Sequence, residues 1–133
     1  IGMLVDSEDP LMDPENTWGH LKLRDNWDKP SGADDEQVMF MTTCMESWIV
    51  ADRVALREHF GPRLQESALP PLFDLEGRNR HDVQDKLIHA TRDCTNAYSK
   101  GSRSFKVLEK LTPTALSALP SFARMLRILM QKL

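Results

Sequence analysis

Residues 33–60 read ADDEQVMFMTTCMESWIVADRVALREHF, and this stretch decides our fold prediction. Acidic residues at its start favour the positive end of a helix dipole, and Gly61-Pro62 is a typical helix end. At 100° per residue, its apolar side chains form one broad face, and further apolar residues lie outside that face. We therefore predict one long helix over residues 33–60, central to a helical bundle. The predicted apolar face consists of Val38, Met41, Met45, Trp48, Ile49, Ala55, Leu56 and Phe60.

Proline and glycine divide the chain beyond residue 60 into shorter segments. Their spacing predicts helices over residues 62–69, 81–99, 104–111, 112–119 and 120–133. Pro120 lacks the N–H that a continuing helix would use, so we predict a break near Leu119. Only residues 20–23 show a strand-like alternation. The predicted fold class is all-α, a compact bundle of about five to six helices with an irregular N-terminal arm.

Residues 1–33 show no sustained helical or strand period. They contain three prolines, but they also carry Trp18 and Trp27, and disordered tails rarely hold two tryptophans. We expect an acidic extended arm over residues 1–33, with residues 1–13 as its mobile part. The arm would pack on a single α-helical domain over residues 34–133. Because Ile1-Gly2 is an unusual start for a natural chain, we expect the domain to belong to a larger protein.

The composition is that of an ordinary globular domain. The chain has 133 residues, of which 41% are hydrophobic and 28% charged, which excludes a wholly disordered or collagen-like chain. No apolar stretch approaches the roughly 20 residues that span a bilayer. Two cysteines, Cys44 and Cys94, form no disulfide framework and are expected as core fillers. We therefore expect an intracellular protein of the cytoplasm or nucleus.

The charge is spread unevenly. Residues 1–37 carry a formal charge of −7, residues 38–77 a charge of −3, and residues 78–133 a charge of +7. One interpretation is that the acidic N-terminal segment lies across the basic half and neutralises it. The other is that the basic half receives an acidic partner for which the N-terminal segment competes.

Helix 81–99 carries the residues with metal-ligand spacing. They are His81, Asp82, Asp85, His89 and Asp93. These residues lie opposite the apolar face of the predicted helix, and Lys86 and Arg92 flank them, which is typical of ion pairs on a helix surface. We predict no metal and no cofactor.

Asp52 and His59 are the unusual polar residues of helix 33–60, because both project from its apolar face. A buried carboxylate needs a partner, so we expect Asp52 to pair with an arginine or with backbone donors. His59 would bond a loop carbonyl. The alternative is a general base and acid in a pocket, but no nucleophile, oxyanion donor or phosphate loop accompanies them. We predict that the protein is not an enzyme and has no small-molecule substrate.

Helix 120–133 is the segment that most favours partner binding. Phe122, Met125, Leu126, Leu129, Met130 and Leu133 form an apolar stripe beside basic residues. We predict a non-enzymatic, regulatory adaptor domain that binds another protein or itself through apolar helix surfaces or the N-terminal arm. The alternative is a basic-surface module that binds membrane lipid or nucleic acid through residues 78–133. The candidate partner-binding residues are Trp18, Trp27, Met39, Phe40, Arg124, Arg127 and Met130.

Overall fold

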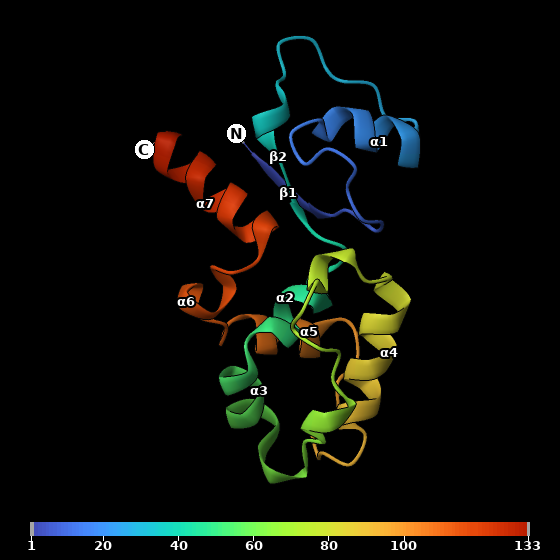
Figure 1. Ribbon diagram of the computed structural model, residues 1–133, viewed down its shortest axis with the longest axis vertical. Coiled ribbons are helices and arrows are strands. Elements are labelled where there is room, and N and C mark those ends of the chain that lie inside the picture. The colour runs from blue at the N-terminus through green and yellow to red at the C-terminus, as the bar shows by residue number, and fades with distance from the viewer. Residues whose placement is uncertain (1, 133) are drawn as a thin grey trace.

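A short parallel sheet lies at one end of the molecule in the computed structural model, which describes residues 2–132 (Figure 1). Its strands are β1 (Met3–Asp6) and β2 (Val38–Met41), and Met3 lies opposite Val38. The prediction of an all-α bundle is therefore wrong, because the fold combines helices with a parallel strand pair.

The predicted helix over residues 33–60 is replaced by four shorter elements. A 3-10 turn (Asp35–Gln37) leads into β2, and α2 (Met45–Ala51) and α3 (Arg53–Phe60) follow. All four residues of β2 are buried. A strand that is covered on both faces buries successive side chains, and a continuous apolar run of this length is equally compatible with a buried helix. For residues 38–41, helical periodicity therefore predicted the wrong one of these two structures.

Residues 1–33 are not an irregular arm. They supply β1 and α1 (Thr17–Asp25), and residues 20–23 are helical. The start of α1 is fixed to the turn before β2, because Thr17 Oγ1 donates to the Asp35 carbonyl at 2.7 Å and the Trp18 N–H donates to Asp35 Oδ1 at 3.0 Å. Leu21 of α1 packs with two β2 residues in a small apolar cluster, which comprises Leu21, Val38 and Phe40.

The second half of the chain contains α4 (Arg80–Thr91), α5 (Ser102–Leu108), α6 (Pro113–Leu116) and α7 (Pro120–Lys132). The break predicted near Leu119 is confirmed. The predicted helix over residues 62–69 is two 3-10 turns instead, Gly61–Arg63 and Glu66–Ala68, and a third covers Leu75–Gly77. The predicted helix 81–99 ends early because the Tyr98 N–H donates to Thr91 Oγ1 at 2.9 Å, which turns the chain back on α4.

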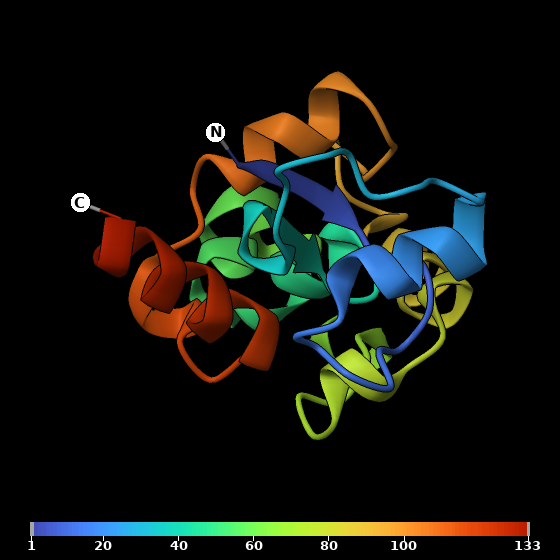
Figure 2. The same cartoon turned by 90° about the horizontal axis from the view of Figure 1, so that it is seen from above.

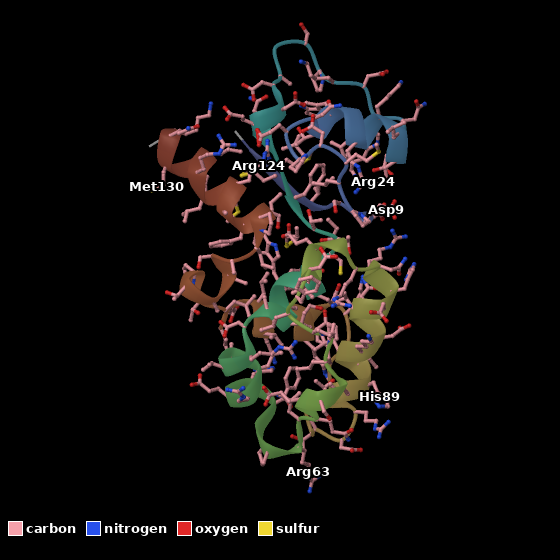
Figure 3. The ribbon with its side chains drawn as sticks, in the orientation of Figure 1. Asp9, Arg24, Arg63, His89, Arg124 and Met130 are labelled. Carbon is pink, nitrogen blue, oxygen red and sulfur yellow. The ribbon has the colours of Figure 1, made fainter. Side chains whose placement is uncertain are left out.

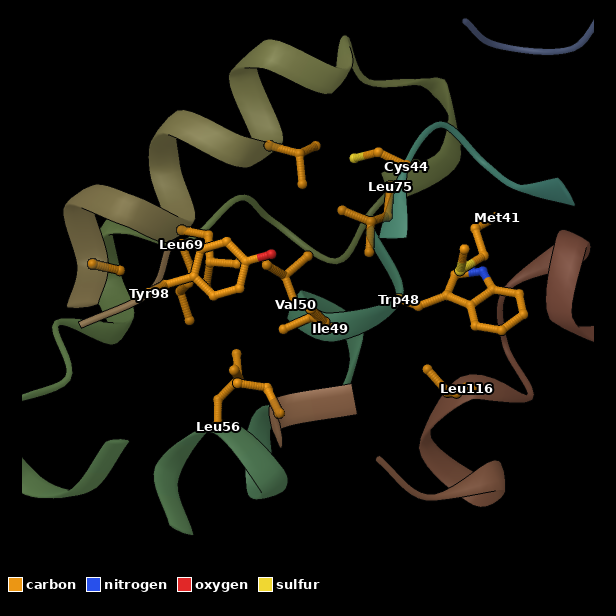
Figure 4. Close-up of a cluster of buried hydrophobic side chains, with 14 of the residues drawn as sticks. Met41, Cys44, Trp48, Ile49, Val50, Leu56, Leu69, Leu75, Tyr98 and Leu116 are labelled. Atoms are coloured by element: carbon orange, nitrogen blue, oxygen red, sulfur yellow. The ribbon is translucent and has the colours of Figure 1, made fainter. Parts of the chain in front are cut away.

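The main apolar cluster lies among α2, α3, α4 and the segments that lead to α7 (Figure 4). Its buried members include Trp48, Ile49, Leu56, Leu87 and Phe122. The sheet lies beyond this cluster, with α7 and α1 on either side of the strand pair when the molecule is seen from above (Figure 2). Within residues 2–132, no helix combines the length and apolar character needed to cross a membrane.

Candidate partner-binding surface

The inner side of α7 is fixed to the sheet by one buried arginine. Arg124 donates to the Val38 carbonyl at 2.8 Å, to the Asp35 carbonyl at 3.0 Å and to Glu15 Oε1 at 2.7 Å. A guanidinium carries five N–H donors in a rigid fork, so one side chain reaches β2, the turn before it and the N-terminal segment together. The position of α7 is therefore set by directional bonds as well as by packing.

A second arginine extends this contact toward the surface. Arg127 donates to Glu15 Oε1 at 3.0 Å and to Glu36 Oε2 at 3.4 Å. Acidic residues of the N-terminal segment thus neutralise Arg124 and Arg127 within the molecule. For these two arginines the contacts agree with the first of the two interpretations of the uneven charge distribution.

The N-terminus of α7 is occupied by a carboxylate of the same chain. Glu76 accepts hydrogen bonds from the Ser121 N–H at 3.0 and 3.1 Å and also from the Ser121 hydroxyl. Burial raises the pKa of Glu76, and the Ser121 hydrogen bonds oppose the rise. Trp48 Nε1 donates to Ser121 Oγ at 2.9 Å, which ties this end of α7 to the main core.

The outer side of α7 carries an apolar surface that the described residues leave uncovered. Leu126, Leu129 and Met130 are 43%, 42% and 67% exposed. We call these three residues the α7 stripe. Figure 3 shows Met130 on the outer side of α7 and Arg124 on the side toward the sheet. A shallow cavity of about 340 Å³ lies beside the stripe, between Phe122, Leu126 and Met130.

A polar cluster lies where the two strands end, and it is sealed. Glu46 is 2% exposed and accepts hydrogen bonds from the Tyr98 hydroxyl at 2.5 Å and from Gln84 Nε2 at 3.1 Å. Burial raises the pKa of Asp6, and the charge of Glu46 adds to the rise. Burial and the bond to Glu46 likewise raise the pKa of Tyr98. The cavity beside the α7 stripe has a different lining. The hydrogen bonds of the polar cluster join α2 to the chain around Tyr98.

Asp52 and His59 do not form an acid–base pair. Asp52 accepts from the Ala55 N–H at 3.0 Å and from the Thr112 N–H at 2.9 Å, so it caps α3 and anchors the turn before α6. The His59 ring packs edge-on against Phe60, and burial lowers the pKa of His59. Asp52 is thus satisfied by backbone donors, as expected, whereas the expected bond of His59 to a loop carbonyl is not found at Nδ1, which is buried without a partner.

The residues with metal-ligand spacing, on α4 and just after it, lie in ordinary surface contacts. Asp82 pairs with Lys86 at 3.3 Å, and Asp93 accepts from Gln65 Nε2 at 2.6 Å. Among residues 2–132, no group of three or more His, Cys, Asp or Glu side chains is arranged to hold a metal ion.

The comparison with protein-family models gives one match, which covers residues 1–130. It is the family described as a domain of unknown function, DUF4276. The chain belongs to this family. Neither the curated proteins nor the solved structures contain a match to it.

Within this DUF4276 domain, the structure separates the candidate partner-binding residues into two groups. Met39 and Phe40 are buried in β2. The Trp18 ring donates from Nε1 to the Asp34 carbonyl at 2.9 Å, and the Arg124 guanidinium donates to three acceptors of the same chain. The residues with substantial exposure are Trp27, Arg127 and Met130.

The predicted partner-binding residues did not include three residues that the structure places at this surface. Leu126 and Leu129 belong to the α7 stripe, and Glu15 is the acidic partner of both arginines. The opposite charges of residues 1–37 and 78–133 signal such a pairing in general, but not which residues take part. Leu133, the last residue of the predicted stripe, lies outside the described residues.

Proposed function

We propose that this DUF4276 domain is a non-enzymatic protein-interaction module that docks a partner on the α7 stripe. The observation that carries the proposal is the exposure of Leu126, Leu129 and Met130 on one side of a helix whose other side Arg124 fixes to the sheet. A rigidly held helix that presents adjacent apolar side chains is a typical docking surface, because covering them removes apolar area from water.

The chemistry of the stripe suits an apolar helix or loop of another polypeptide. Met130 and Leu126 line the cavity beside the stripe, and methionine adapts to partners of different shape. Arg127 is 45% exposed at the edge, where it supplies a polar rim. Other exposed apolar residues, such as Phe73 and Val54, belong to separate elements.

The alternative of a surface for lipid or nucleic acid receives less support. Two of the basic residues in the range 78–133 that would carry it, Arg124 and Arg127, are bonded to acceptors of the same chain. An enzyme based on Asp52 and His59 receives none, because Asp52 is a cap for α3 and for the turn before α6. We place the protein in a reducing, intracellular compartment, which suits its two buried and unpaired cysteines.

The test is a double substitution, Leu126→Asp with Met130→Asp, in a bait used for affinity capture from lysate with and without nuclease. Phe73→Asp with Val54→Asp is the matched control, since it places the same charges on exposed apolar residues elsewhere. We expect the parent and the control to retain a stoichiometric protein partner, or a second copy seen by light scattering, and the stripe variant to lose it. Retention by the stripe variant, or recovery that nuclease abolishes, contradicts the proposal.

A further inference from the structure

A cavity of about 260 Å³ lies where β2 ends and α7 begins. In open α/β sheets, ligands usually bind beyond the carboxyl ends of the strands, and Thr42, which directly follows β2, lines this cavity. Its volume is just below the range of roughly 300–1,000 Å³ that is typical for drug-sized ligands, so the cavity suits a smaller molecule. Its apolar walls come from the N-terminal segment and from β2, and consist of Pro10, Leu11, Pro14 and Phe40.

Two carboxylate residues, Asp74 and Glu76, also line this cavity. Within residues 2–132, no ion pair involves either side chain. Burial raises the pKa of Glu76, and the groups that oppose the rise are the N–H and hydroxyl of Ser121, which carry no charge. A Cβ at Gly77 would lie 2.6 Å from Asp74 Oδ1, so the absence of a side chain there makes room for the Asp74 carboxylate. This wall therefore carries negative charge that no ion pair of the described residues balances.

A positively charged side chain, Arg124, lines the same cavity from α7 (Figure 3). Its guanidinium has five N–H groups, and three of them donate to the acceptors described above. The other two N–H groups have no acceptor among residues 2–132. Residues three apart on a helix lie on the same side, so Arg124 is one turn from Ser121, which holds Glu76. The cavity therefore has hydrogen-bond donors of positive charge about one helical turn from its carboxylates.

This combination of charges discriminates between small ligands. A simple amine would be attracted by Asp74 and Glu76, but it would bring a second positive charge close to Arg124. A simple carboxylic acid would meet the reverse arrangement. A zwitterion places each of its charges beside a group of opposite charge, and charge-assisted hydrogen bonds are the strong ones. The apolar walls favour a ligand that also has an aliphatic or aromatic body.

We propose that this cavity binds a free α-amino acid with an apolar side chain, as a ligand that is held and not transformed. The ammonium group donates to the carboxylates of Asp74 and Glu76, and the carboxylate accepts from the two remaining N–H groups of Arg124. The side chain of the ligand lies against the apolar wall that includes Leu11 and Phe40. None of the α7 stripe residues lines this cavity, so its failure and that of the proposed function are distinguishable.

The experiment titrates the full chain with L-leucine and with L-phenylalanine, followed by calorimetry and by the amide signals in NMR spectra. At least one of the two should bind saturably with one site per chain, and it should shift the amide signals of Gly77 and Ser121. Two matched probes each remove one charge from leucine: 3-methylbutylamine lacks the carboxylate, and 4-methylpentanoate lacks the ammonium group. Each should bind at least about tenfold more weakly than leucine, because a charged hydrogen-bonding partner is lost. Glycine, which lacks the apolar side chain, should also bind more weakly.

Two protein variants locate the binding. Asp74→Asn removes one charge at an exposed position, and asparagine tolerates the backbone φ of +50° found there. Gly77→Ala keeps the charge but displaces the Asp74 carboxylate. Both should weaken binding of the amino acid by about tenfold, while the melting temperature shows that each stays folded. Asp28→Asn, a largely exposed site elsewhere, and Leu126→Asp with Met130→Asp should bind as the parent does. The proposal is overturned if neither amino acid binds, if the amine or the acid alone binds as tightly as leucine, or if Asp74→Asn leaves the affinity unchanged.

Discussion

The main core and the sheet region are stabilised by different kinds of contact. The main core is an extended cluster of buried apolar side chains from α2 to α7, whereas the fully enclosed cluster of the sheet region consists of Leu21, Val38 and Phe40. The sheet region compensates with directional bonds, among them those of Arg124 to β2 and those of Asp35 to α1. The sheet region therefore depends more on directional bonds than the main core does, although the core also contains buried polar contacts such as that between Tyr98 and Glu46.

This difference predicts how the two regions respond to perturbation. Apolar burial is non-directional and little affected by salt, so the main core should open only with global unfolding. The sheet region depends on a few charged and polar groups, some of them half exposed, and should open locally at a lower free energy. The candidate surface, the α7 stripe, lies on the helix that Arg124 fixes to this second region.

The largest effect is expected from a cavity in the main core. Leu87 is fully buried on α4, and Leu87→Ala should lower the free energy of unfolding by about 3 kcal/mol, since it removes buried methyl groups and leaves a void. Urea denaturation measures this change. Ile88→Ala is the control on the same helix, and its half-exposed side chain should cost less than about 1 kcal/mol. Equal losses in the two variants would contradict the assignment of Leu87 to the core.

The second largest effect is expected from Arg124→Met. The apolar stem of methionine keeps part of the packing, but the carbonyls of Val38 and Asp35 lose their donor, at a cost of about 2 kcal/mol. Amide exchange should show that β2 loses protection while α4 keeps it. Lys110→Met, on the exposed surface near α5, should change neither. If α4 loses protection to the same extent as β2, the two regions form one cooperative unit and the comparison fails.

The breaks at prolines in the helical half of the fold could be predicted from the sequence, and the sheet could not. Pro120 and the Thr112-Pro113 pair carry strong local signals, and the break at Leu119 and the start of α6 follow them. Residues 38–41 carry no such signal, because a short apolar run fits a buried strand and a buried helix equally well. Their partner, β1, is more than thirty residues away in sequence, and only long-range pairing distinguishes the two structures.

The candidate surface was predictable only in part. The apolar stripe of residues 120–133 follows from helical periodicity, and the structure places Leu126 and Met130 of that stripe on the outer side of α7. The contacts of Arg124 do not follow from helical periodicity, because periodicity places a residue on one side of a helix but does not identify the groups that its side chain will bond.

A pair of identical substitutions should act in opposite directions. The hydroxyl of Thr42, just after β2, is buried without a partner, so Thr42→Val should raise the free energy of unfolding by about 1 kcal/mol. Thr91, in the main core, donates to the Leu87 carbonyl at 3.0 Å and accepts from the Tyr98 N–H, so Thr91→Val should lower it by about 1 kcal/mol. Thermal and urea unfolding of both variants measures the signs. Two losses would show that the Thr42 hydroxyl finds a partner in solution.

The smallest effect concerns the charge of Asp6 at the end of β1. Burial and the charge of Glu46 raise the pKa of Asp6 above its ordinary value of 3.8, so the folded protein binds this proton more tightly than the unfolded chain does. The stability contributed by the proton is complete below the unfolded pKa and is lost as pH rises through the folded pKa.

Asp6→Asn keeps an oxygen acceptor and removes the charge, so the variant should melt slightly above the parent at neutral pH, and the difference should vanish toward pH 3. Melting temperatures of both proteins between pH 3 and 8 test this, with Asp28→Asn, a largely exposed residue outside the sheet, as the control. A variant that melts below the parent at neutral pH would mean that the ionised carboxylate stabilises the end of the sheet, and that charge as well as hydrogen bonding stabilises the sheet region there.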